Sequence, residues 1–218
     1  MNDGYIEEII SILRGELEKR ELPIVSHLAK EKRNPFVILI STLLSLRTKD
    51  EVTSEATKRL FSLASTPQEI LQLSPEIIAK TIYPVGFYKN KAKTILATCR
   101  ELMDRYNSLV PDTMEQLLAM KGVGRKTANL VLTLGFNKEG ICVDTHVHRI
   151  SNRLGYVRTG APEQTEFVLR EKLPHQYWLD YNTLLVAFGQ HVCRPISPLC
   201  GSCPVRHYCD RVGVTKSR

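Results

Sequence analysis

KGVGRKTA at residues 121–128 separates two helical patterns, which cover residues 113–120 and roughly 125–134. A Gly-Val-Gly turn between two helices is typical of a helix-hairpin-helix, because glycine allows positive φ and a close approach of the backbone to another molecule. The amides of the turn and of the next helix start then form an anion site, which suits a nucleic-acid phosphate. A plain αα-turn is the alternative, but Lys121 and Arg125 beside the turn favour phosphate.

Most of the remaining sequence also consists of helical patterns. Three helix starts combine a capping residue with proline at the first helical position, namely Asn34-Pro35, Thr66-Pro67 and Ser74-Pro75. Glu69 is placed to complete a capping box after Thr66, and Asp112 or Thr113 caps the helix that precedes the turn. Because no alternating strand pattern of useful length is found, the sequence predicts an all-α fold of roughly ten helices.

The first twenty residues predict an amphipathic helix, which ends before a break at Glu21-Leu22-Pro23. Its apolar face consists of Ile6, Ile9, Ile10, Leu13 and Leu17. A second break covers residues 135–140. The two breaks leave a central helical block of about 110 residues, which is near the common size of a domain.

The charge balance indicates a polyanionic partner. Thirty Lys and Arg residues against 23 Asp and Glu residues give a net charge of +7, and an excess of this size attracts nucleic acid. No apolar run reaches 18 residues, and the first helix carries too many charges for a signal peptide. The sequence therefore predicts a soluble, intracellular protein without a membrane segment.

Four of the six cysteines occur near the end of the sequence with the spacing C-x6-C-x2-C-x5-C. They are Cys193, Cys200, Cys203 and Cys209. This spacing predicts one metal site with four thiolates on a short loop, and four thiolates suit either a [4Fe–4S] cluster or tetrahedral zinc. Disulfides are the alternative, which the lack of a secretory signal disfavours. Cys99 and Cys142 are interpreted as buried thiols.

Two further residues have the chemistry of a reaction centre. Lys126 lies at a helix start after the turn, where a neutral amine can attack a carbon and form a Schiff base; the alternative is a solvated lysine that binds phosphate. Asp144 precedes a helix, where aspartate is a good N-cap, and its carboxylate could also stabilise positive charge at a reacting carbon. His146 and His148 could contact phosphate, pair with acids or be exposed.

In order and spacing, these motifs resemble the endonuclease III family of DNA glycosylases over about residues 10 to 212. The resemblance rests on GVGRKTAN at 122–129, VDTHVHRISNRLG at 143–155, the cysteine spacing, Leu43-Leu44-Ser45 with Asp50, and GFYKNKA at 86–92. Two positions depart from the family's pattern. Arg47 stands where bacterial members have a glutamine that fills the hole left by a flipped base, and Lys121 replaces a common proline.

The resemblance implies a role for each matching residue. Lys126 would attack C1′ of a damaged nucleotide that has been flipped from the duplex, while Asp144 stabilises the developing sugar cation and orients or deprotonates the amine. Loss of the base, a Schiff base and β-elimination would then cut the strand. Phe87 would wedge into the base stack or be a buried core residue. Contacts with DNA are implied for Arg47, Phe87, Lys121, Gly122, Val123, Gly124, Arg125, Thr127 and His146.

The resemblance also implies the domains, the cofactor and the partner. Residues 23–135 would form a six-helix barrel with the helix-hairpin-helix, and residues 1–22 with 136–218 a domain that holds a [4Fe–4S] cluster on the four cysteines, with DNA in the cleft between them. The implied activity is that of a bifunctional DNA glycosylase and AP lyase of base excision repair. It would remove oxidised pyrimidines from double-stranded DNA, or cut at abasic sites, as a monomer at the nucleoid in the cytoplasm. A mismatch glycosylase for thymine, uracil or adenine is the alternative within this fold, and a non-catalytic DNA-binding module is the remote one.

Overall fold

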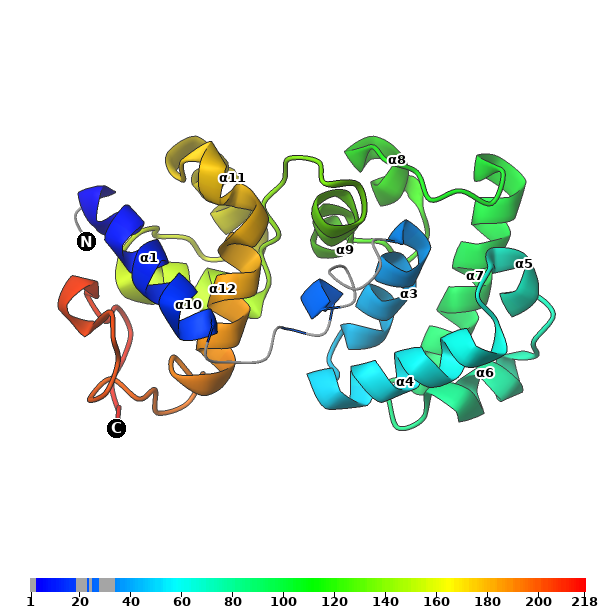
Figure 1. The fold of residues 1–218 in the computed structure, drawn as a ribbon, viewed down its shortest axis with the longest axis horizontal. Coiled ribbons are helices and arrows are strands. Elements are labelled where there is room, and N and C mark those ends of the chain that lie inside the picture. Colours follow the sequence, from blue (N-terminus) through cyan, green and yellow to red (C-terminus); the bar gives the residue numbers. More distant parts are fainter. Residues whose placement is uncertain (1–2, 19–22, 24, 28–33) are drawn as a thin grey trace. The chain divides into compact units, whose positions relative to one another are not determined.

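The computed structural model describes residues 3–18, 23, 25–27 and 34–218, and every regular element in these ranges is a helix (Figure 1). The predicted all-α class is therefore confirmed. The chain divides into two compact units, Ile24–Gly140 and a discontinuous unit that joins Met1–Pro23 to Ile141–Arg218. The expected break at Glu21-Leu22 lies outside the described residues, and the domain limits at residues 22 and 135 stay a prediction.

The unit Ile24–Gly140 is built around α3, an apolar helix that is buried on almost every side. Ile38, Leu39 and Ile40 are each 0% exposed, and α3 packs against α4, α7, α9 and η2. From residue 34 onward, the helices of this unit are α3 (Pro35–Ser45), α4 (Asp50–Leu63), α5 (Pro67–Ile70), α6 (Pro75–Ile82), α7 (Tyr88–Tyr106), α8 (Met114–Ala119), α9 (Arg125–Leu130) and the π-helical turn η2 (Val131–Gly135).

Prolines at the first helical position begin α3, α5 and α6, as the sequence predicts. The side chains of Asn34, Thr66 and Ser74 cap these helices by accepting hydrogen bonds from backbone N–H groups in the first turn. In the capping box at Thr66, Glu69 contacts the backbone N–H of Thr66 only weakly and has a stronger partner one residue earlier. Glu69 Oε2 accepts from the backbone N–H of Ser65 at 2.6 Å, one residue before the cap.

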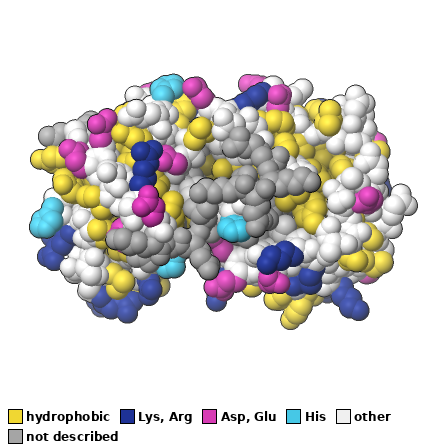
Figure 2. All heavy atoms as spheres, viewed as in Figure 1, with side chains coloured by type: hydrophobic (Ala, Val, Ile, Leu, Met, Phe, Trp, Pro, Cys, Tyr) yellow, Lys and Arg dark blue, Asp and Glu magenta, His cyan; other side chains and the backbone are white. Residues whose placement is uncertain are grey.

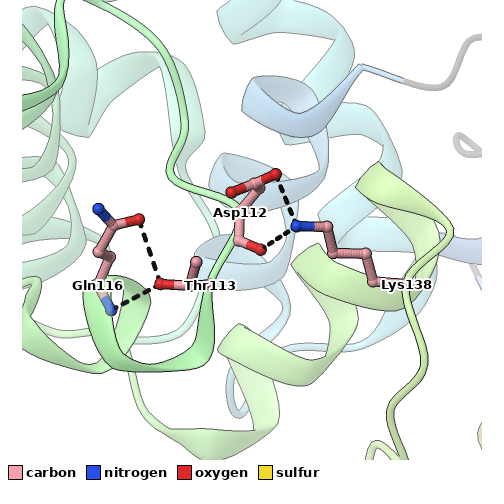
Figure 3. A network of polar contacts seen from close by, with 4 residues as sticks. All are labelled: Asp112, Thr113, Gln116 and Lys138. Carbon is pink, nitrogen blue, oxygen red and sulfur yellow. Dashed lines mark hydrogen bonds and ion pairs between the residues drawn. The ribbon is translucent and has the colours of Figure 1, made fainter.

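The segment before α8 is held at two points (Figure 3). Thr113, and not Asp112, caps α8, since Thr113 Oγ1 accepts from the N–H of Gln116 at 3.3 Å. Asp112 instead binds Lys138, whose Nζ donates to Asp112 Oδ2 at 2.6 Å and to Asp112 O at 2.7 Å. Lys138 follows η2, so this ion pair connects the start of α8 with the segment that leaves the second helix of the hairpin.

The discontinuous unit places the first helix against the last long one. The apolar face of α1 packs on α12, and α10 packs on both α11 and α12 (Figure 1). On α1, Ile6, Ile9, Ile10 and Leu13 are buried and Leu17 is half-buried. The helices of this unit are η1 (Asp3–Tyr5), α1 (Ile6–Leu17), α10 (Thr145–Leu154), α11 (Pro162–Lys172), η3 (His175–Tyr177), α12 (Trp178–His191) and η4 (Arg206–Tyr208).

The surface carries its positive charge in several places. On the face drawn in Figure 2, the Lys and Arg side chains form separate groups, with hydrophobic and acidic side chains between them. In the described part of the chain, no helix combines the length and the apolar character that crossing a bilayer requires.

Candidate functional site

The turn at residues 121–124 joins α8 to α9, and the predicted helix-hairpin-helix is confirmed. Its two glycines have different conformations. Gly122 has φ +84°, a value that favours glycine. Gly124 has φ −98° and is the N-cap of α9. Only the first glycine therefore uses the left-handed region.

The two glycines offer a matched test of the turn. We expect Gly122→Ala to lower the free energy of unfolding by about 1–2 kcal/mol, because it combines positive φ with a Cβ only 2.8 Å from Thr94 Cγ2. Gly124→Ala is the control, since its φ is negative and no atom lies within 4 Å of the added Cβ. Urea unfolding of both variants checks this, and equal losses would contradict it.

Lys126 lies in the first turn of α9 and is half-buried. Its neighbours in the motif differ in exposure. Lys121 is exposed and Arg125 is half-buried, whereas Val123 and Thr127, backbone included, are only 6% and 2% exposed. The N–H of Val123 donates to Met120 O at 3.2 Å, so it closes the hairpin turn from within.

Asp144 is the N-cap of α10, as one interpretation of the sequence holds. Its Oδ1 accepts from the N–H of His146 at 2.8 Å and from the N–H of Val147 at 3.0 Å. The side chain is half-buried. Two hydrogen bonds to one oxygen fix the direction of the carboxylate before any ligand binds.

The two histidines of α10 have partners within their own unit. His146 Nδ1 lies 3.2 Å from Arg149 Nη2, and the same Arg149 nitrogen donates to Cys193 O at 2.9 Å. His148 Nδ1 lies 2.7 Å from Thr165 Oγ1, and burial lowers the pKa of His148. His146 and Arg149 thus connect the first turn of α10 with the first cysteine of the loop.

Arg47 and Phe87 meet at two turns of the unit Ile24–Gly140. Both have left-handed backbones, with φ 54° and φ 56°. Phe87 is 60% exposed, so the interpretation as a core phenylalanine is wrong. The guanidinium carbon of Arg47 lies 5.7 Å from the centroid of the Phe87 ring, which is within cation–π range.

Lys91, for which the sequence motifs predict no role, has its ammonium group close to these turns. The residue is 9% exposed, and Nζ donates to Leu44 O at 2.7 Å, Leu46 O at 2.5 Å and Thr48 Oγ1 at 3.1 Å. Burial, and to a smaller extent the positive charge of Lys126, lowers the pKa of Lys91 to about 8.

A single cavity in the discontinuous unit is lined by all four cysteines of the C-terminal motif, Cys193, Cys200, Cys203 and Cys209. Its other walls are mainly apolar and include Ile150, Leu154, Phe188, Val192, Leu199 and Val205. None of the six cysteines forms a disulfide bond. Among the residues that the structure describes, no three Cys, His or acidic side chains already form a single-ion site. Four thiols around one apolar cavity fit the donor set of an iron–sulfur cluster.

Burial favours the protonated form of two thiols of this loop, Cys203 and Cys209. It raises the pKa of Cys203 to about 11 and also raises the pKa of Cys209, so binding of metal would displace protons. Arg153 holds both ends of the loop. Its Nη1 donates to Cys193 Sγ at 3.5 Å and to Arg194 O at 2.6 Å, and its carbonyl accepts from Cys209 Sγ at 3.3 Å.

Two families match the sequence. HhH-GPD superfamily base excision DNA repair proteins match residues 40–175. The iron–sulfur binding domain of endonuclease III matches residues 193–209, the segment that contains the four cysteines.

Individual proteins are similar over most of the chain. Endonuclease III of Thermotoga maritima is 47% identical over 180 residues, which cover 83% of this chain and 84% of that protein. Endonuclease III homolog 2, chloroplastic, of Arabidopsis thaliana is 43% identical over 189 residues, and these cover 83% of this chain and 48% of the plant protein. A solved structure of a trapped endonuclease III–DNA covalent intermediate matches with a TM-score of 0.87 and 33% identity, over 97% of both chains.

Proposed function

The chain belongs to the endonuclease III family within the HhH-GPD superfamily of base excision DNA repair proteins, and on that premise we propose which residues carry its reaction. It is a DNA glycosylase and AP lyase of base excision repair, its partner is DNA, and its cofactor is a [4Fe–4S] cluster. The observation that carries the assignment is the position of Lys126, in the first turn of the helix that follows the hairpin.

Lys126 is the proposed nucleophile. Its neutral amine attacks C1′ of the damaged nucleotide, the bond between C1′ and the base breaks, and the base leaves with the bonding electrons and takes up a proton. Opening of the sugar ring gives a Schiff base between Nζ and C1′. Loss of a proton from C2′ then expels the 3′ phosphate oxygen, which cuts the strand by β-elimination.

Asp144 is proposed to stabilise the positive charge that develops on the sugar and to orient or deprotonate the amine of Lys126. The hydrogen bonds to His146 and Val147 engage only Oδ1 of this carboxylate. They hold the charge in a fixed direction, so no reorganisation is needed at the moment of reaction.

Two substitutions of Asp144 distinguish its role as the N-cap of α10 from its proposed role in the reaction. Asp144→Asn keeps an oxygen that caps α10 and loses the negative charge, so we expect little change in the melting temperature and a fall in single-turnover rate on the order of 10²-fold. Asp144→Ala should show a similar loss of rate and, in addition, a loss of about 1 kcal/mol in unfolding free energy. Full activity of Asp144→Asn would exclude the proposed role.

The remaining motif residues are proposed to hold the DNA. Amides of Gly122, Gly124 and Thr127 bind a backbone phosphate, whereas the N–H of Val123 holds the turn through Met120 O. Lys121 and Arg125 add positive charge beside the phosphate. His146 is proposed as a further contact to DNA. Phe87 enters the base stack, and Arg47 faces the base opposite the flipped nucleotide.

The proposed substrates are oxidised pyrimidines and abasic sites in duplex DNA. The test is incubation with duplexes that carry thymine glycol, an abasic site, a G·T mismatch or a G·U mismatch, followed by reduction with borohydride. We expect covalent trapping with thymine glycol and with the abasic site. Base release only from the mismatches, without trapping, would favour the mismatch glycosylase instead.

The cluster is proposed to be a structural support held by Cys193, Cys200, Cys203 and Cys209. When bound, its irons supply four bonds to thiolates that close the loop, while Arg153 holds the ends of that loop from the protein side. The two compact units are proposed to be the barrel domain and the cluster domain. The proposed working state is a monomer, and the proposed location, because the partner is DNA, is the cytoplasm at the nucleoid.

A further inference from the structure

Lys91 engages three acceptors with one buried ammonium group. Leu44 O, Leu46 O and Thr48 Oγ1 lie 2.7, 2.5 and 3.1 Å from its Nζ. An ammonium group has three N–H donors, and these contacts use all of them. Leu44 belongs to the last turn of α3, where carbonyl groups lack partners within the helix. The charge of Lys91 therefore stabilises the end of α3 and the turn that follows it.

The same network reaches a second turn. Thr48 Oγ1 also accepts from the N–H of Gly86 at 3.1 Å, and a Cβ at residue 86 would lie 2.6 Å from Arg47 O. The backbones of the two turns are thus in direct contact, which only glycine at residue 86 allows. The backbone of Lys91 is also bound to the second turn, since its N–H donates to Phe87 O at 2.9 Å.

Each turn presents one residue in a conformation that requires support. Arg47 and Phe87 both have positive φ, which residues other than glycine hold only where the surrounding structure determines it. Their side chains lie against each other at 5.7 Å. The pair is therefore organised by the protein itself, before any DNA is bound.

We propose that Lys91 is a positioning residue, which fixes Arg47 and Phe87 as one rigid element and thereby sets how the enzyme discriminates among bases opposite the damage. The inference rests on the proposed contacts of these two side chains with DNA. The guanidinium of Arg47 carries its donors in a rigid plane, so its selectivity among bases depends on where that plane is held. All three N–H donors of the Lys91 ammonium group are used within the protein. Lys91 therefore affects base selectivity through the two turns and not by binding DNA itself.

The test uses the full-length protein with its cluster and four duplexes that carry thymine glycol opposite A, G, C or T. Single-turnover rates give the ratio between the best and the worst opposite base. We expect Lys91→Met to lower this ratio by on the order of tenfold, because a displaced recognition group loses its selectivity. If the wild-type ratio is below about ten, the ratio in the variant should fall to one. A second readout is the fluorescence of 2-aminopurine placed opposite a tetrahydrofuran abasic analogue. The change in this fluorescence when the protein binds the duplex should be smaller for Lys91→Met than for the wild type.

Two variants accompany this measurement. Lys93→Met removes the same charge from an exposed position on α7 and should keep the wild-type ratio. Thr48→Val removes the hydroxyl that joins Lys91 to Gly86 and should compress the ratio in the same direction, which keeps the test decisive if Lys91→Met does not fold.

The outcomes separate this proposal from the proposed function. A uniform loss of rate at an unchanged ratio, in Lys91→Met or in Thr48→Val, indicates a purely structural role and overturns the proposal. If the ratio is lost in Arg47→Ala but kept in Lys91→Met, Arg47 reads the opposite base and only the role of Lys91 is refuted. If Arg47→Ala keeps the ratio, or if the wild type cuts all four duplexes at the same rate, Arg47 does not read the opposite base. The proposed contact of Arg47 and the proposed role of Lys91 are then both refuted.

Discussion

Lys126→Ala should abolish covalent trapping of the protein on abasic-site DNA in the presence of borohydride. Without the amine at residue 126 no Schiff base forms at C1′, so there is no imine to reduce. The rate of strand cutting should fall by on the order of 10⁴-fold or more, the scale seen when a covalent nucleophile is removed from other enzymes. Gel separation of the trapped complex and single-turnover cutting rates measure the two effects.

A matched lysine and a binding assay make this result specific. Lys93→Ala removes a lysine that is exposed on α7, and it should trap DNA as the wild type does. Lys126→Ala should still bind the duplex, because one lost positive charge among several phosphate contacts changes affinity by only about tenfold. Trapping that persists in Lys126→Ala would assign the nucleophile to a different residue.

Cys203→Ala should remove the cluster and unfold the loop that carries it. Between Cys193 and Cys209 the only regular element is the short η4, so the loop has few backbone hydrogen bonds of its own. We expect iron to be lost, the visible absorption to disappear, and the protein to lose several kcal/mol of stability, which lowers the melting temperature by on the order of 10 °C. Iron analysis, absorption spectra and thermal unfolding check the three effects.

Cys142→Ala is the control for this substitution. Cys142 is 2% exposed and belongs to the same unit, but it does not line the cysteine cavity. Its removal deletes a buried thiol without touching the proposed ligand set, so the iron content should stay at the wild-type level. A full complement of iron in Cys203→Ala would show that the cluster does not depend on this thiol.

The features that the sequence predicts correctly are encoded locally. A capping residue followed by proline determines a helix start within four residues, and α3, α5 and α6 begin where this rule indicates. The hairpin glycines and the cysteine spacing are local in the same way. Even here, the sequence predicts the partners of side chains less well than the limits of helices. The main backbone partner of Glu69 is the N–H of Ser65, and the N–H of Thr66 is a weaker one, because neighbouring N–H groups at a helix start compete for one carboxylate.

Contacts between distant segments are the part that the sequence leaves open. Arg47 and Phe87 are 40 positions apart, and their contact depends on the close approach at Gly86, which no local pattern encodes. The burial of Lys91 did leave a signal. It falls in helical register with the buried Ile95, Cys99 and Leu102 of α7, so a lysine stands on an apolar face, where a charge is tolerated only if its hydrogen-bond donors find acceptors.

The pairing of α1 with α12 has a consequence for how the protein is made. The unit Ile24–Gly140 is continuous, so it can fold as soon as it has left the ribosome. The apolar face of α1 leaves first but meets α12 only after roughly 160 further residues, which at ordinary rates of synthesis takes about 8 to 30 s. During that interval Ile6, Ile9 and Ile10 lack their final neighbours. The nascent chain therefore presents a short hydrophobic segment to chaperones before the discontinuous unit can close.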